Sequence, residues 1–195
     1  MAVPQRNNPA VRGFRPLFTF LLIAGILGAA AGWYAAPNPE LDWDRGELPS
    51  IADKVLEMIA KRSLSVTVTE AELNALVKQE LYKQRFISND LEMTGAETML
   101  DGDRMTVFTD LVYKGRVRFQ LKHQFQFAWE APELTATHLS TSLKDIPLPA
   151  SWFPIGTIRV PLSFGEKVPA EVRQVQFLED AVQLDIKLLL TNPFF

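Results

Sequence analysis

The sequence predicts an α+β protein in which an N-terminal transmembrane helix precedes two helices packed on or within a long curved antiparallel β-sheet of five to six strands. Three observations lead to this prediction: twenty uncharged residues near the N-terminus, apolar residues at helical spacing between residues 50 and 84, and a period of two after about residue 86. The 195 residues, 47% hydrophobic and 22% charged, suffice for one domain plus an appendage.

The first element is the run LFTFLLIAGILGAAAGWYAA, residues 17–36. Twenty residues of helix match a hydrocarbon core of roughly 30 Å. Three arginines precede the run and acidic residues follow it, so the N-terminus is expected inside and the rest outside the cell membrane. Trp33 and Tyr34 suit the outer interface. A cleaved signal peptide ending at Ala31 is the alternative.

This interpretation divides the chain into four parts. Residues 1–15 are a cytoplasmic N-terminus, 16–36 the transmembrane anchor, 37–49 a proline-containing linker, and 50–195 an extracytoplasmic α+β domain. Beyond residue 36 the chain holds 17 basic and 23 acidic side chains. Such an acidic domain disfavours nucleic acid as a partner, because phosphates require a basic surface.

Two helices follow, over about 50–62 and 70–84. Between them lies LSVTVTEAELNALV, residues 64–77, in which a short alternating strand leads into the second helix. Thr69 and Glu72 have the spacing of a capping box, and Glu70 suits the positive end of the helix dipole. These tasks account for both glutamates without catalysis. Leu73, Leu76, Val77 and Leu81 form one apolar stripe.

The strands begin after residue 86, with turns at LDGDR (100–104) and YKGR (113–116). The segment RVRFQLKHQFQFAWE, residues 116–130, alternates throughout and predicts an unusually long strand. Its apolar face includes five large side chains: Phe119, Leu121, Phe125, Phe127 and Trp129. Two closing strands pair Val175 and Phe177 with Val182 and Leu184 across a turn at residues 179–180.

The strand after the 131–133 turn changes parity, which predicts a bulge near His138. The two histidines, His123 and His138, face each other if the hairpin is centred between residues 130 and 131. They are diagonal neighbours if it is centred one residue later. A third metal ligand cannot be named, so one hydrogen-bonded core histidine and one bulge histidine are preferred to a metal site.

Two further features are candidate contact surfaces. Arg116, Arg118 and Lys122 form a basic row on the polar face of the long strand, either ordinary solvated surface or a contact for anionic lipid headgroups or wall polymers. Residues 146–170 form a proline-rich excursion in which Trp152 and Phe153 either plug the core or touch a membrane or partner.

The sequence gives no indication of an enzyme. It has no cysteine, which removes thiolate metal sites and cysteine nucleophiles, and none of the common catalytic or phosphate-binding motifs is present. No catalytic residue, metal site or cofactor is therefore predicted.

The order of these pieces resembles the YpmS family of uncharacterised membrane-anchored envelope proteins of Gram-positive bacteria. The N-terminal anchor, LSVTVTEAELNALV, the amphipathic strands, IPLPASWFP (146–154) and VQFLEDAVQLDIKLLL (175–190) carry the resemblance, which covers nearly the whole chain. It implies an extracytoplasmic domain with a helix cradled by a sheet, and no catalytic residue.

Two functions are expected from these observations. The first is a non-enzymatic, membrane-anchored domain that binds a lipid or another apolar ligand between the stripe of the second helix and the apolar face of the long strand. The second is a structural or scaffolding module that recruits a cell-envelope partner protein, with a filled core and an exposed apolar patch at Trp152 and Phe153.

Overall fold

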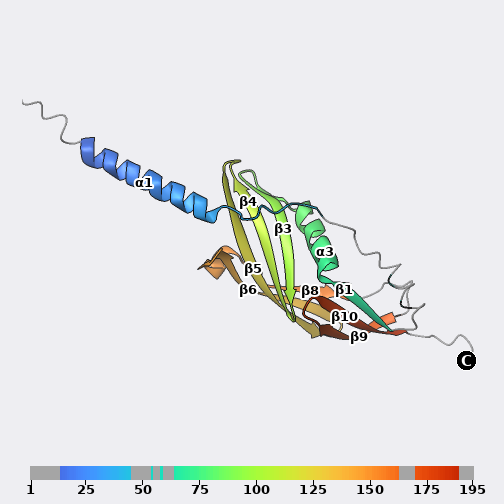
Figure 1. Ribbon diagram of the computed structural model, residues 1–195. Coiled ribbons are helices and arrows are strands. Elements are labelled where there is room, and N and C mark those ends of the chain that lie inside the picture. The colour runs from blue at the N-terminus through green and yellow to red at the C-terminus, as the bar shows by residue number, and fades with distance from the viewer. Residues whose placement is uncertain (1–13, 45–53, 55–57, 59–63, 163–169, 189–195) are drawn as a thin grey trace, which may run out of the picture. The chain divides into compact units, whose positions relative to one another are not determined.

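The computed structural model describes residues 14–44, 54, 58, 64–162 and 170–188 (Figure 1). The chain divides into two compact units, residues 1–36 and 37–195. In the first unit, helix α1 spans Phe14–Ala35. Among the described residues, no helix is long and apolar enough to cross a membrane.

The second unit confirms the α+β class, with two antiparallel sheets where one was predicted. The large sheet has, in order, β2 (Phe86–Ser88), β3 (Leu91–Asp101), β4 (Arg104–Tyr113), β5 (Val117–Glu130), β6 (Glu133–Leu143) and β7 (Ile146–Pro147), and β8 (Thr157–Pro161) also pairs with β6. The small sheet has, in order, β1 (Ser65–Thr69), β10 (Ala181–Leu188) and β9 (Ala170–Phe177). The predicted single meander was wrong because the two closing strands pair with β1, the strand before the second helix, and not with the large sheet.

The second unit keeps the predicted order of helices, hairpin strands and two closing strands, and has additional short elements inside the excursion at residues 146–161. Of the helix expected over residues 50–62, only Lys54 and Met58 are described, both helical; the rest lies outside the described residues. Helix α3 (Glu70–Lys83) directly follows β1, and the 3₁₀ helix η2 (Ala150–Trp152) lies between β7 and β8.

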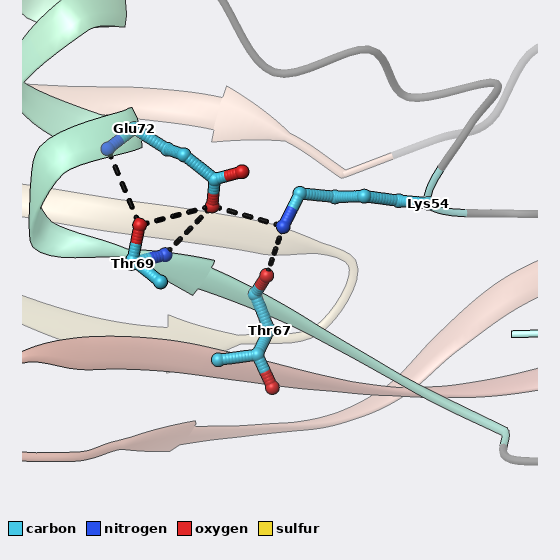
Figure 2. A network of polar contacts seen from close by, with 4 residues as sticks. All are labelled: Lys54, Thr67, Thr69 and Glu72. Carbon is cyan, nitrogen blue, oxygen red and sulfur yellow. Dashed lines mark hydrogen bonds and ion pairs between the residues drawn. The ribbon is translucent and has the colours of Figure 1, made fainter. Parts of the chain in front are cut away.

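Helix α3 begins where the sequence places its start. The Thr69 side chain accepts a hydrogen bond from the N–H of Glu72, and the Glu72 carboxylate accepts one of 2.9 Å from the N–H of Thr69. Figure 2 shows that Lys54 reaches the same carboxylate at 2.9 Å and also donates to the carbonyl of Thr67 in β1. The capping box is confirmed, and Lys54 joins it to the edge of the small sheet.

The long strand β5 has the predicted alternation and lies between β4 and β6. Its odd-numbered residues form the inner face of the large sheet, where Phe125 and Phe127 are buried. The β5–β6 hairpin turns at Ala131 and Pro132, since Glu130 pairs with Glu133. The register shifts between Gln124–Ser140 and Phe125–His138, which leaves Leu139 as the extra residue. The predicted bulge near His138 is therefore confirmed.

Candidate functional site

Most side chains predicted to line an apolar ligand site lie in two packed clusters on the inner face. Phe125 and Phe127 belong to the first cluster, whose partly buried border includes three residues of the α3 stripe, Leu73, Val77 and Leu81, together with Trp129. Leu121 belongs to the second cluster, with Phe119 at its border. Leu76, the fourth residue of the predicted stripe, is exposed. In the described part of the domain these residues therefore pack helix against sheet.

A shallow pocket of about 190 Å³ lies on the opposite, outer face of the large sheet and is polar. It is lined by Pro37, Glu40, Leu41, Thr94, Asp110 and Arg118. Ligand pockets for drug-sized molecules are usually larger, about 300–1,000 Å³. Asp110 is buried in it, and its carboxylate accepts hydrogen bonds from the N–H of Leu41 (2.7 Å) and from Gln120 (2.8 Å). Burial raises the pKa of Asp110 despite these two donors.

The residues expected as a linker contribute to this pocket, because residues 37–44 lie against the sheet. The backbone of Leu41 passes so close to Gly95 that a Cβ on the glycine would overlap the Leu41 carbonyl oxygen. Trp43 packs edge-on against Tyr82 of α3, with ring centroids 5.4 Å apart. This segment, called the strap below, therefore belongs to the compact unit that begins at Pro37.

The polar face of α3 that carries Glu70 and Asn74 lies along the edge of β3, and Figure 1 shows the two elements side by side. From Gly95 on, this edge has no neighbouring strand among the described residues. The N–H of Leu100 donates to the Glu70 carboxylate at 2.7 Å, and the N–H of Thr98 donates to Asn74 at 2.9 Å. Glu70 and Asn74 thus replace a missing strand, since an open edge otherwise invites pairing with other chains.

The two histidines form a polar cluster on the inner face. The hairpin is centred on the later of the two predicted positions, so His138 pairs with Phe125 and lies diagonal to His123. The ring centroids are 6.1 Å apart, and the Thr141 hydroxyl lies 2.9 Å from Nδ1 of His123 and 2.9 Å from Nε2 of His138. Burial, and secondly the charge of His138, lower the pKa of His123 to about 4.

The neighbours of His123 in this cluster are hydroxyls and aromatic rings. Nε2 of His123 lies 3.4 Å from the Thr109 hydroxyl, and Phe153 packs edge-on against the imidazole with centroids 5.8 Å apart. Among the described residues no group of three or more histidine or acidic side chains could hold a metal ion. The geometry agrees with the interpretation as one hydrogen-bonded core histidine, His123, and one bulge histidine, His138.

The three cations predicted to form a basic row have different surroundings in the structure. Arg118 forms an ion pair with Glu40 of the strap. Arg116 lies in the β4–β5 turn, not in the strand, and Lys122 is partly buried on the outer face. The three cations do not form a continuous row of unpaired charge, which weakens the headgroup-contact interpretation.

Trp152 and Phe153 take opposite positions in the excursion. Phe153 packs against the second inner-face cluster, whereas Trp152 is 66% exposed. Ile146 pairs with Leu143, and Ile158 and Val160 pair with Ala136 and Leu134, so these three residues share the inner face of the sheet. Ile155 and Trp152, in the segment between β7 and β8, are exposed as well, and the five residues together are called the apolar border: Ile146, Trp152, Ile155, Ile158 and Val160.

Comparison with known proteins identifies no relative: no family model, no curated protein and no solved structure matches the chain. The resemblance to the YpmS family therefore stays a prediction.

The sequence did not predict the strap, the edge contacts of Glu70 and Asn74, or the strands β7 and β8 that carry the apolar border. A weak signal for the border existed in Ile158 and Val160, which alternate with Thr157 and Arg159 inside the excursion.

Proposed function

We propose that this protein is a membrane-anchored, extracytoplasmic, non-enzymatic domain that binds lipid or another apolar molecule at the border of its sheet. The observation that carries the proposal is the apolar border, in which Ile146, Ile158 and Val160 are 44–50% exposed although they lie on the same face as the core. Exposed apolar side chains that continue a core in this way are typical of interaction surfaces.

The border replaces the internal ligand site expected from the sequence. Leu73, Val77 and Leu81 pack against the first cluster. A lipid chain could instead lie along the border, beside Trp152, whose ring suits a site with one apolar and one wet side. The membrane anchor and the extracytoplasmic location rest on residues 17–36 and on the charges that flank them.

A photoactivatable phospholipid in vesicles that contain the full chain tests the proposal. Trypsin cuts after Lys144 and Arg159, so four of the five border residues fall in one peptide, residues 145–159. We expect the lipid to crosslink to this peptide, and we expect the crosslink to be lost in the double variant Trp152→Ser/Ile158→Ser. The matched control is Leu178→Ser, which removes an exposed leucine from the β9–β10 turn. Crosslinking confined to the N-terminal peptides would contradict lipid binding at the border.

The location has a separate test, because the protein has no native cysteine. A single cysteine introduced at the exposed position Ser140 should react with a membrane-impermeant maleimide in intact cells. Labelling that requires lysis would contradict the extracytoplasmic location. N-terminal sequencing of the mature chain distinguishes an anchor from cleavage after Ala31.

The second candidate function is a scaffolding module that recruits an envelope partner protein through the same border. The packed inner-face clusters and the exposed Trp152 support this function as well as they support lipid binding. A photocrosslinking amino acid at position 152 separates the two functions, because a defined protein adduct would favour the scaffold and a lipid adduct the ligand-binding domain.

A further inference from the structure

The excursion between β7 and β8 covers the histidine cluster and is attached at both of its ends to residues of that cluster. The N–H of Leu148 donates to the Thr141 carbonyl at 2.9 Å, and the N–H of His138 donates to the Gly156 carbonyl at 3.1 Å. Residues 148–156 therefore span the bulge at Leu139, with β8 pairing to β6 before the bulge and β7 after it. This segment is called the flap below.

The inner side of the flap contacts His123 through Phe153, and its outer side carries Trp152. On the central strands, His123 has Val107 and Thr109 of β4 and Thr141 and His138 of β6 as neighbours. The flap also covers the cluster, but unlike the strands it is not held in place by pairing with a neighbouring strand over several residues. A change in the cluster will therefore displace the flap before it displaces the sheet.

The cluster accommodates one positive ring more readily than two. With both rings neutral, the Thr141 hydroxyl can donate to one ring and accept from the other. A proton on one ring makes that ring nitrogen a donor, and the hydroxyl turns to donate to the other ring. With both rings protonated, the Thr141 oxygen can accept a hydrogen bond from each, so the cost of the second proton is the repulsion between two partly buried positive rings, whose centroids lie 6.1 Å apart.

We propose that residues 148–156 form an acid-sensitive flap, which moves off the inner face when the His123–His138 pair becomes doubly protonated. In the described residues, no carboxylate faces His123 from β4, β6 or the flap, and His138 is the one titratable neighbour. The added charge is therefore relieved by water, which reaches the rings when Phe153 leaves. The lowered pKa of His123 places the transition near pH 4.

Opening would also detach Trp152 and Ile155 from the rest of the apolar border, so acid would weaken lipid binding. This consequence alone rests on the proposed function. The movement itself does not, and it is measured without lipid ligand.

Two spin labels measure the movement in the full chain, which has no other cysteine. One label is placed at Ser151→Cys in the flap and the other at Glu97→Cys, an exposed position on β3. The distance distribution is expected to be single at pH 7.5 and to gain a longer component at pH 4. The control pair, Glu97→Cys with Gln126→Cys on β5, lies within the sheet and should not change.

His123→Gln supplies the matched test, because an uncharged amide can still bond both threonine hydroxyls. The flap distance should then stay single at pH 4, and His138→Gln should act in the same way if the first variant does not fold. An unchanged distribution in the unsubstituted background would overturn the proposal. So would an equal change in the control pair, or opening that persists in the glutamine variants.

Discussion

The carboxylate of Glu70 accepts a hydrogen bond of 2.7 Å from the backbone N–H of Leu100, thirty residues later in the chain. The contact joins the first turn of α3 to the far end of β3. Asn74, one helical turn on, makes the same kind of bond to Thr98. The helix thereby completes the hydrogen bonding of a strand edge with side chains.

Replacing Glu70 by alanine should destabilise the domain by about 1.5–3 kcal/mol, because the buried N–H of Leu100 loses a charged acceptor. Glu70→Gln keeps an oxygen acceptor and should lose less. Urea unfolding of the full chain in mild detergent, followed by tryptophan fluorescence, measures both. The control Glu80→Ala removes an exposed ion pair with Lys83 and should change stability by less than about 0.5 kcal/mol. Equal losses for Glu70 and Glu80 would contradict the edge-closing role.

Thr98→Val should stabilise the domain. The Thr98 hydroxyl is buried and has no hydrogen-bond partner in the described structure. Valine has nearly the same shape, so the substitution removes an unsatisfied polar group without leaving a cavity, and a gain of about 1 kcal/mol is expected. Thr135→Val is the matched control, because the buried Thr135 hydroxyl donates to the Ala128 carbonyl at 3.2 Å. A gain in the control as large as in Thr98→Val would contradict the explanation.

Gly95→Ala should detach the strap, because the added methyl group overlaps the carbonyl of Leu41. The expected loss of stability is about 1–3 kcal/mol, typical of forced overpacking. Limited proteolysis should show earlier cleavage within residues 37–44. Ala128→Ser adds one atom at an exposed position of β5 and should leave the cleavage pattern unchanged. Unaltered cleavage in Gly95→Ala would show that the strap does not depend on the close approach.

Stability should rise with pH between about 4 and 6.5 because of His123. Its folded-state pKa of about 4 lies below the ordinary value of 6.5, so in this window the unfolded chain binds the proton and the folded chain does not. The neutral ring contributes its full stabilisation above pH 6.5, and this is lost as pH falls through 4. The difference corresponds to about 3 kcal/mol. Urea unfolding at several pH values should show the free energy of unfolding rising with pH in this window, and a smaller rise in His123→Gln. An equal rise in the variant would contradict the assignment of the pH dependence to His123.

Local patterns predicted much of the fold. The alternation of β5, the capping box at Thr69 and the parity change near His138 are all readable over a few residues, and the structure has each of them. The contacts of Glu70 and Asn74 were not predictable, because a side chain that bonds a distant backbone leaves no periodic signal. The prolines of residues 146–170 concealed β8, whose single proline, Pro161, lies at the end of an edge strand, where it is tolerated.

The bulge at Leu139 shows that one inserted residue can determine a site as much as the identity of its side chains does. His138 and Thr141 are three residues apart, and on a regular strand an odd separation would place them on opposite faces. The extra residue brings both to His123. Deleting Leu139 would therefore dismantle the polar cluster while leaving each of its members in the sequence. Between relatives of this protein, a one-residue gap here would separate chains with the cluster from chains without it.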